Sequence, residues 1–124
     1  SLKINLLKIN NTTNDCLDLS LGIYDIKNIT ANSCKDKAIS VGEKSILNNY
    51  YSFISNSNIG VSSKDSSIIK IENLLTNNIG LCLEAYNKKQ EFNGAQLFVN
   101  KSNCAENNFS VGYNSLIKIN EFSQ

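Results

Sequence analysis

Short apolar runs alternate with polar stretches along the whole chain. The apolar runs recur roughly every ten residues and are separated by Asn, Ser and Gly, which favour turns. No long segment has the 3.6-residue period of an amphipathic helix. The pattern predicts ten short strands, at residues 3–9, 16–19, 39–41, 45–49, 51–54, 68–71, 82–85, 95–99, 109–111 and 116–119. Short strands joined by polar turns indicate an all-β sandwich or barrel.

Two parts of the chain resemble each other. Residues 2–19 align with residues 69–85 once a one-residue gap is allowed, and both contain Lys-Ile, a polar turn and then Cys-Leu followed by an acidic residue. Further on, residues 40–42 and 110–112 both read Ser-Val-Gly. We therefore expect a duplicated unit. The residues between the copies, 50–67, are interpreted as a shortened third copy rather than a linker.

The spacing of the four cysteines follows the same repeat. Cys34 and Cys104 are slightly farther apart in sequence than Cys16 and Cys82, and a four-residue loop insertion in the second copy explains the difference. The chain has no C-x-x-C spacing and no histidine, so two disulfides are a better interpretation than a zinc site. Disulfides indicate an oxidising compartment, and we expect a secreted or cell-surface protein. No apolar run reaches the roughly 20 residues that span a bilayer.

Charge and composition exclude several classes of function. Twelve positive charges, all of them lysine, offset eleven carboxylates to leave a net charge of +1. This mixed pattern argues against a nucleic-acid-binding face. Without histidine there is no histidine-dependent catalysis, and no G-x-S-x-G motif is present. We expect no enzyme activity, no cofactor and no bound metal. The 21 Asn residues are discounted as nucleotide bias in the coding sequence.

Residues 80–109 resemble one repeat of the ricin-type lectin β-trefoil family. That repeat contains G-x-C-L-D, a polar turn with N-G, then Q-L-W, a second cysteine bonded to the first, and a closing Q-x-W. The matching residues here are Cys82-Leu83-Glu84, Asn93-Gly94, Gln96-Leu97-Phe98, Cys104 and Asn107-Asn108-Phe109. The first unit matches at Cys16-Leu17-Asp18 and Cys34, and residues 38–40 stand in for the closing motif. Phe replaces both family tryptophans.

The resemblance implies a fold and a disulfide pairing. The fold is an all-β β-trefoil with pseudo-threefold repeats, formed by a single domain over residues 1–124. Its repeats would cover residues 1–48, 49–67 in shortened form, and 68–124. The two intra-repeat disulfides would be Cys16–Cys34 and Cys82–Cys104, the pairing that respects the repeat. A different two-repeat β fold is the alternative.

The resemblance also implies a sugar site. A shallow sugar site uses an acidic side chain to bind hydroxyls, an aromatic face to stack on the ring, and amides that both donate and accept. In the last repeat these groups would be Glu84, Gln96, Phe98 and Asn107. In the first repeat the acid would be Asp18, with Tyr24 as the aromatic platform.

The function expected from this site is that of a lectin-like module that binds cell-surface glycans or glycoproteins. Such modules also serve as subunits of toxins or adhesins, so further subunits are candidate partners. The alternative is a protein-interaction or protease-inhibitor trefoil without sugar binding. In that case the Lys88-Lys89 pair would enter a trypsin-like pocket.

Overall fold

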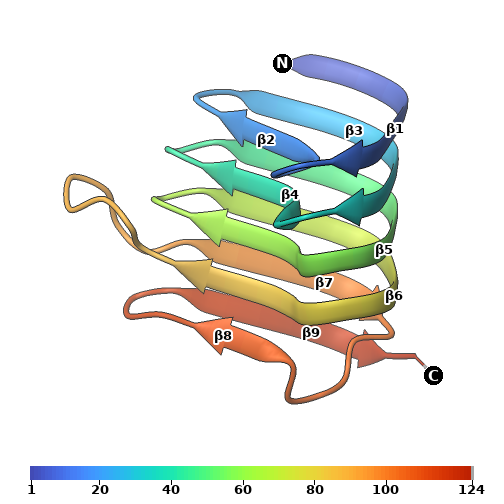
Figure 1. Cartoon of the computed structure of the whole chain (residues 1–124). Coiled ribbons are helices and arrows are strands. Elements are labelled where there is room, and N and C mark those ends of the chain that lie inside the picture. The colour runs from blue at the N-terminus through green and yellow to red at the C-terminus, as the bar shows by residue number, and fades with distance from the viewer. Residues whose placement is uncertain (124) are drawn as a thin grey trace.

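The computed structural model describes residues 1–123 and shows a parallel β-solenoid, in which the chain winds through stacked coils (Figure 1). The strands are β1 (Leu2–Thr12), β2 (Leu17–Ser20), β3 (Ile23–Cys34), β4 (Lys37–Gly42), β5 (Ile46–Lys64), β6 (Ile68–Tyr86), β7 (Gln96–Ser102), β8 (Phe109–Val111) and β9 (Leu116–Phe122). We number the coils 1 to 6, beginning with β1, β3, β5, β6, β7 and β9.

The strands line two walls of the solenoid. The first wall has the order β1-β3-β5-β6-β7-β9. The second wall consists of β2, β4, the second halves of β5 and β6, and β8. Every ladder in both walls is parallel, and each joins one coil to the next. The all-β prediction is therefore confirmed.

The predicted β-trefoil is wrong. A trefoil needs the strands of each lobe to pair with one another around a threefold axis, whereas here each strand pairs with its equivalent in the next coil. Nearly all predicted strands fall within observed ones, but β3 was missed altogether because Asp, Lys and Asn interrupt its apolar residues.

The internal similarity in the sequence arises from positions three coils apart. Leu17 pairs with Ile39, Ile39 with Val61, and Val61 with Leu83, and each step covers the same number of residues. The two Cys-Leu-acidic segments are thus separated by three coils of equal length. The Ser-Val-Gly segments are likewise three coils apart, because Ser40 pairs through Ser62 and Glu84 to Ser110. The last of these steps is longer than the others, so the insertion lies between β6 and β8.

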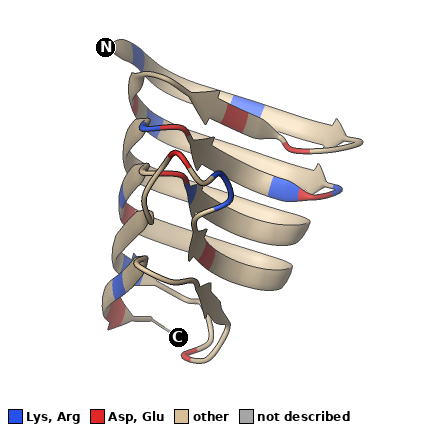
Figure 2. Ribbon diagram, turned by 90° about the vertical axis from the view of Figure 1, so that its left-hand side faces the viewer, with Lys and Arg blue, Asp and Glu red and all other residues tan. Residues whose placement is uncertain are grey.

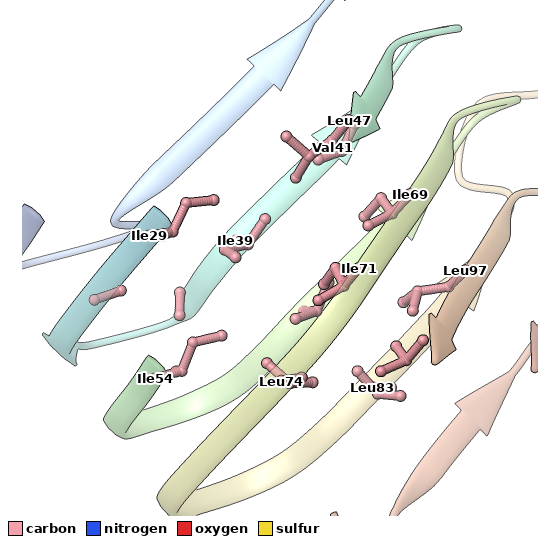
Figure 3. Packing of buried hydrophobic residues seen from close by; sticks show 14 of the residues in the cluster. Ile29, Ile39, Val41, Leu47, Ile54, Ile69, Ile71, Leu74, Leu83 and Leu97 are labelled. Atoms are coloured by element: carbon pink, nitrogen blue, oxygen red, sulfur yellow. The ribbon is translucent and has the colours of Figure 1, made fainter. Parts of the chain in front are cut away.

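The core fills the space between the two walls (Figure 3). Residues that alternate along a strand face opposite sides, so one set from each wall points inward. Most of the buried cluster is Ile, Val and Leu, whose branched side chains pack well on a pleated surface, and Ala and Cys make up the rest. The largest apolar side chains with at most 1% exposure are Ile26, Ile29, Ile39, Leu47, Ile54, Ile69, Leu83 and Leu97.

Both predicted disulfides, Cys16–Cys34 and Cys82–Cys104, are confirmed. Cys34 ends β3 and pairs with Thr12 of β1, while Cys16 immediately precedes β2, so the first disulfide joins coils 1 and 2. The second joins β6 to the segment after β7, which ties coil 4 to coil 5. The bonds close loops with sequence separations of 18 and 22 residues. On the loop-entropy model, a disulfide that closes a loop of this size stabilises the folded protein by about 3 kcal/mol.

Asparagine has a structural role at the corners of the coils. Asn11, Ser33, Asn56 and Asn78 occupy one corner of four successive coils, and all have φ between 53° and 59°. Asn tolerates this left-handed backbone better than most residues. Amide side chains also bond between neighbouring coils, as in Asn32 to Asn10 and Asn78 to Asn56, at 3.0 and 2.8 Å. The Asn excess that we discounted as nucleotide bias therefore fits the demands of this fold.

The loop between β6 and β7, residues 87–95, projects from the regular stack (Figure 1). Asp65, which is fully buried, holds this loop because its carboxylate accepts hydrogen bonds from the backbone N–H groups of Lys88 and Lys89 at 2.7 and 2.9 Å. The Lys89 ammonium also pairs with Glu43. The Lys88-Lys89 pair thus belongs to a braced loop, with one of its two ammonium groups already engaged.

Candidate ligand-binding groove

A groove of about 1210 Å³ runs along the first wall from β1 to β9. Three neighbouring positions of each of coils 1 to 5 line it, and two positions of coil 6. We name the outer sets the Lys3 row and the Asn5 row, and the set between them the floor row. The Lys3 row is Lys3, Asp25, Asn48, Lys70, Phe98 and Lys118; the floor row is Ile4, Ile26, Asn49, Ile71 and Val99; the Asn5 row is Asn5, Lys27, Tyr50, Glu72, Asn100 and Asn120.

The groove lies where the parallel ladders are interrupted. Between β1 and β3 the register includes Ile4–Ile26 and resumes at Leu6–Asn28, so the Asn5 row lacks ladder pairs. The same interruption recurs in every ladder of the first wall. Breaks of this kind bend a strand, and the long strands curve accordingly (Figure 1). The outward side chains on the two sides of the bend form the walls of the groove.

Side-chain amides bind some of the carbonyl groups that the interruption leaves free. Asn28 Nδ2 donates to the carbonyl of Asn5 at 3.2 Å, and Asn73 Nδ2 donates to the carbonyl of Tyr50 at 3.3 Å. Both bonds lie at exposed positions, where each adds a modest contribution to stability. The kink is therefore supported by side chains that the sequence supplies at these positions.

Asn49 is the one polar residue of the floor row, and it is engaged within the protein. Its Nδ2 donates to the carbonyls of Ile26 and Tyr51 at 2.8 and 3.1 Å. Its Oδ1 accepts the Ser52 hydroxyl at 2.6 Å, and the residue is only 7% exposed. The chemistry of the groove is consequently set by the Lys3 and Asn5 rows.

The groove contains more lysines than carboxylates, and the lysines and carboxylates also differ in their contacts. Four lysines and two carboxylates line it, for a net charge of +2. Asp25 accepts a hydrogen bond from Asn48 Nδ2 at 2.9 Å, and Glu72 accepts one from Asn100 Nδ2 at 3.0 Å. Within residues 1–123 the ion pairs are Lys37–Asp36, Lys89–Glu43 and Lys101–Glu121, none of them in the groove. Blue and red segments recur down the left-hand edge of the stack in Figure 2.

Two aromatic side chains stand in the groove. Tyr50, in the Asn5 row, is 57% exposed, and Phe98, in the Lys3 row, is half-buried. Phe98 pairs in register with Lys70 on one side and with Lys118 on the other. An aromatic face thus lies between two ammonium-bearing side chains in consecutive coils.

The structure does not bring the predicted sugar-site residues together. Phe98 alone of the six lines the groove. Gln96 begins the same strand but lies outside the groove lining, in register with Ile68 and Leu116. Glu84 and Asp18 are on the second wall, three coils apart.

The last two predicted residues are also outside the groove lining. The Tyr24 hydroxyl donates to the carbonyl of Ser20 at 2.8 Å, which directs its ring toward the corner after β2. Asn107 is exposed in the loop before β8. The trefoil alignment grouped residues that follow one another in sequence, whereas the solenoid groups residues one coil apart.

Two groups on and beside the second wall have shifted pKa values. Burial raises the pKa of Tyr86, with a smaller contribution from the nearby Glu84 carboxylate. Partial burial acts to lower the pKa of Lys37, but its hydrogen bond to the Asp36 carboxylate and the nearby charges of Asp36 and Asp15 together raise it. Neither residue lines the groove.

Sequence analysis missed most of the groove, although a signal was present. Residues 3–5 and 118–120 read Lys-Ile-Asn, and residues 70–72 read Lys-Ile-Glu. Each triplet supplies one residue to each side of the groove, and in residues 3–5 and 70–72 the Ile between them, Ile4 or Ile71, belongs to the floor row. Residues 8–10 also read Lys-Ile-Asn but lie outside the groove, so the triplet becomes informative only once the register is known.

Comparison with models of protein families, with curated proteins and with solved structures gave no match. Among residues 1–123 no helix is long and apolar enough to cross a membrane. The same residues contain no group of three or more His, Cys, Asp or Glu side chains arranged to hold a metal ion.

Proposed function

We propose that the protein binds an extended glycan chain along the groove of the first wall. The observation that carries this proposal is the continuity of the groove across all six coils. Neighbouring strands lie about 4.8 Å apart, so six strands give a groove roughly 24 Å long. A lining of this length offers a linear polymer a series of similar contacts rather than one pocket.

The chemistry of the lining supports a sugar ligand. Amides of the Asn5 row and carboxylates of Asp25 and Glu72 can bind hydroxyl groups. Tyr50 and Phe98 offer faces on which sugar rings can stack. Shallow, wet sites give modest affinity, and binding several sugar units at once would raise it. The two disulfides indicate an oxidising environment, and we place the protein among secreted or surface molecules that meet glycans there.

The length of the ligand provides the first test. Titration calorimetry with one oligosaccharide series, from monosaccharide to about ten units, should show affinity that rises until the roughly 24 Å groove is filled. Affinity that does not change with length would contradict an extended site. Absence of binding to every series of a glycan array would overturn the proposal.

Substitutions inside and outside the groove test whether the ligand binds there. Tyr50→Ala and Phe98→Ala should each weaken binding by about 3- to 10-fold, equivalent to ~1 kcal/mol from loss of one stacking face. Tyr113→Ala is the matched control, because Tyr113 is 82% exposed and lies outside the groove. Glu84→Ala, on the second wall, is a control for the site expected from sequence. Weaker binding in the controls alone would move the site away from the groove.

A further inference from the structure

The lysines of the groove have exposed side chains without ionic partners. Lys3, Lys27, Lys70 and Lys118 are all exposed, and none forms an ion pair within residues 1–123. They belong to coils 1, 2, 4 and 6, so positive charge is distributed along the groove rather than gathered at one end.

The two carboxylates of the groove do not cancel this charge. Asp25 and Glu72 each accept a hydrogen bond from an amide in the neighbouring coil, which occupies part of their accepting capacity. With four lysines to two carboxylates, the groove carries +2, whereas the whole chain carries only +1. The remainder of the molecule is therefore slightly negative, and the groove is its positive region.

Two of the groove lysines also lie beside the aromatic residue Phe98. Lys70 and Lys118 are in register with Phe98, one coil before it and one coil after it. Adjacent coils are about 4.8 Å apart, so a ring stacked on Phe98 would have an ammonium group within reach on either side. A sugar that bears an anionic group beside its ring would use both the face and the charge.

We propose that the ligand of the groove is an acidic glycan, in which carboxylate or sulfate groups bind the unpaired groove lysines. This inference rests on the proposed function and adds the charge of the ligand to it. A linear polymer with regularly spaced anionic groups could contact lysines in several coils at once, so individually weak contacts would add. Exposed charges are screened by salt, so the contribution should fall with ionic strength.

The test compares four probes of matched length on the intact, disulfide-bonded protein by fluorescence anisotropy. They are a hyaluronan oligosaccharide with carboxylates, a heparin oligosaccharide with sulfates, a neutral cello-oligosaccharide and an oligothymidylate. At least one acidic sugar should bind about tenfold more tightly than the neutral one at about 0.05 M salt. The difference should shrink at about 0.5 M salt, where screening is strong. Binding of hyaluronan as tight as that of heparin would show that carboxylates suffice, whereas preference for heparin would show a requirement for its sulfates or its higher charge density.

The variant pair Lys70→Gln with Lys118→Gln should weaken acidic-sugar binding about tenfold and leave neutral-sugar binding within about twofold. Lys8→Gln with Lys35→Gln removes the same charge outside the groove and should change neither. Lys8 is a close control because it stands in a Lys-Ile-Asn triplet like those of the groove.

The outcomes separate the two proposals. Equal affinity for acidic and neutral sugars would overturn the acidic-glycan inference and leave the glycan groove standing. Tighter binding of oligothymidylate than of both acidic sugars would also overturn it, in favour of a nucleic-acid site. Absence of binding to all three sugars would overturn the acidic-glycan inference, and absence of binding across the whole glycan array would overturn both proposals. Equal weakening by the Lys8/Lys35 control pair would show that net charge, rather than the groove, determines binding.

Discussion

The central and terminal coils of the solenoid are held together by different means. In the centre, β5 and β6 are each 19 residues long and pair along most of that length. At the ends, β2, β7, β8 and β9 have only three to seven residues. Both disulfides lie toward the ends, between coils 1 and 2 and between coils 4 and 5. The last ladder, between β7 and β9, joins coils 5 and 6 without a disulfide, so each covalent bond fastens a pair of coils near one end rather than every short ladder.

The difference between central and terminal coils follows from the one-dimensional nature of a solenoid. Each coil contacts only its neighbours, so stability is close to a sum of coil and interface contributions. A central coil has a neighbour on both sides, whereas Leu2, Leu6, Leu116 and Phe122 in the outer strands are 38% to 54% exposed. The outer coils therefore gain less from burial, and cross-links have most effect there.

The largest expected effect is removal of a central core side chain. Ile54→Ala or Leu83→Ala, both at fully buried positions, should lower the free energy of unfolding by about 2–5 kcal/mol through lost burial and a cavity. Ile119→Ala, at a half-buried position in β9, should cost only about 1–2 kcal/mol because part of the side chain already contacts water. Urea titration measures both, and equal losses would contradict the difference between centre and ends.

The second prediction concerns the disulfides. Replacing both cysteines of Cys82–Cys104 with serine should cost about 3 kcal/mol, and the same change at Cys16–Cys34 a similar amount. Hydrogen exchange should accelerate first in coil 5 when Cys82–Cys104 is removed and in coil 1 when Cys16–Cys34 is removed, while amides between β5 and β6 stay protected. Uniform acceleration through the whole chain would show instead that all coils open together.

The sequence allowed the all-β class and the disulfide pairing to be predicted, because both depend on local patterns or on the repeat. The repeating coil of the solenoid was not predicted, because its period can be seen in the sequence only where distinctive residues recur. That period is the step from Ala38 to Gly60. Cys16 and Cys82 stand out, but the intermediate coils carry Ala38 and Gly60 at the corresponding positions, without a motif. The detected repeat was consequently three coils long, a length that a trefoil lobe also fits.

The groove was harder to predict than the fold. Its residues are far apart in sequence and become neighbours only through the register. Phe98 was selected because it belongs to a motif, whereas Tyr50 belongs to none of the motifs that the sequence offered. No local pattern distinguishes Lys70, which is in the groove, from Lys8, which is not. The sequence supplied the chemistry of the lining without its arrangement.

The smallest expected effect lies at the boundary between the central coils and the projecting loop, where Tyr86 ends β6. Burial raises the pKa of its hydroxyl above the ordinary value of 10.0, since ionisation would place a charge in a partly buried site. A raised pKa in the folded state means that this contribution to stability is complete below the pKa of the unfolded chain. It is lost as the pH rises through the folded-state value. Spectrophotometric titration should therefore show a tyrosine that ionises late and is absent from Tyr86→Phe. That variant should also lose less stability than the wild type between neutral and strongly alkaline pH. A titration curve of Tyr86→Phe that loses amplitude without losing its late-ionising phase would contradict the raised pKa of Tyr86.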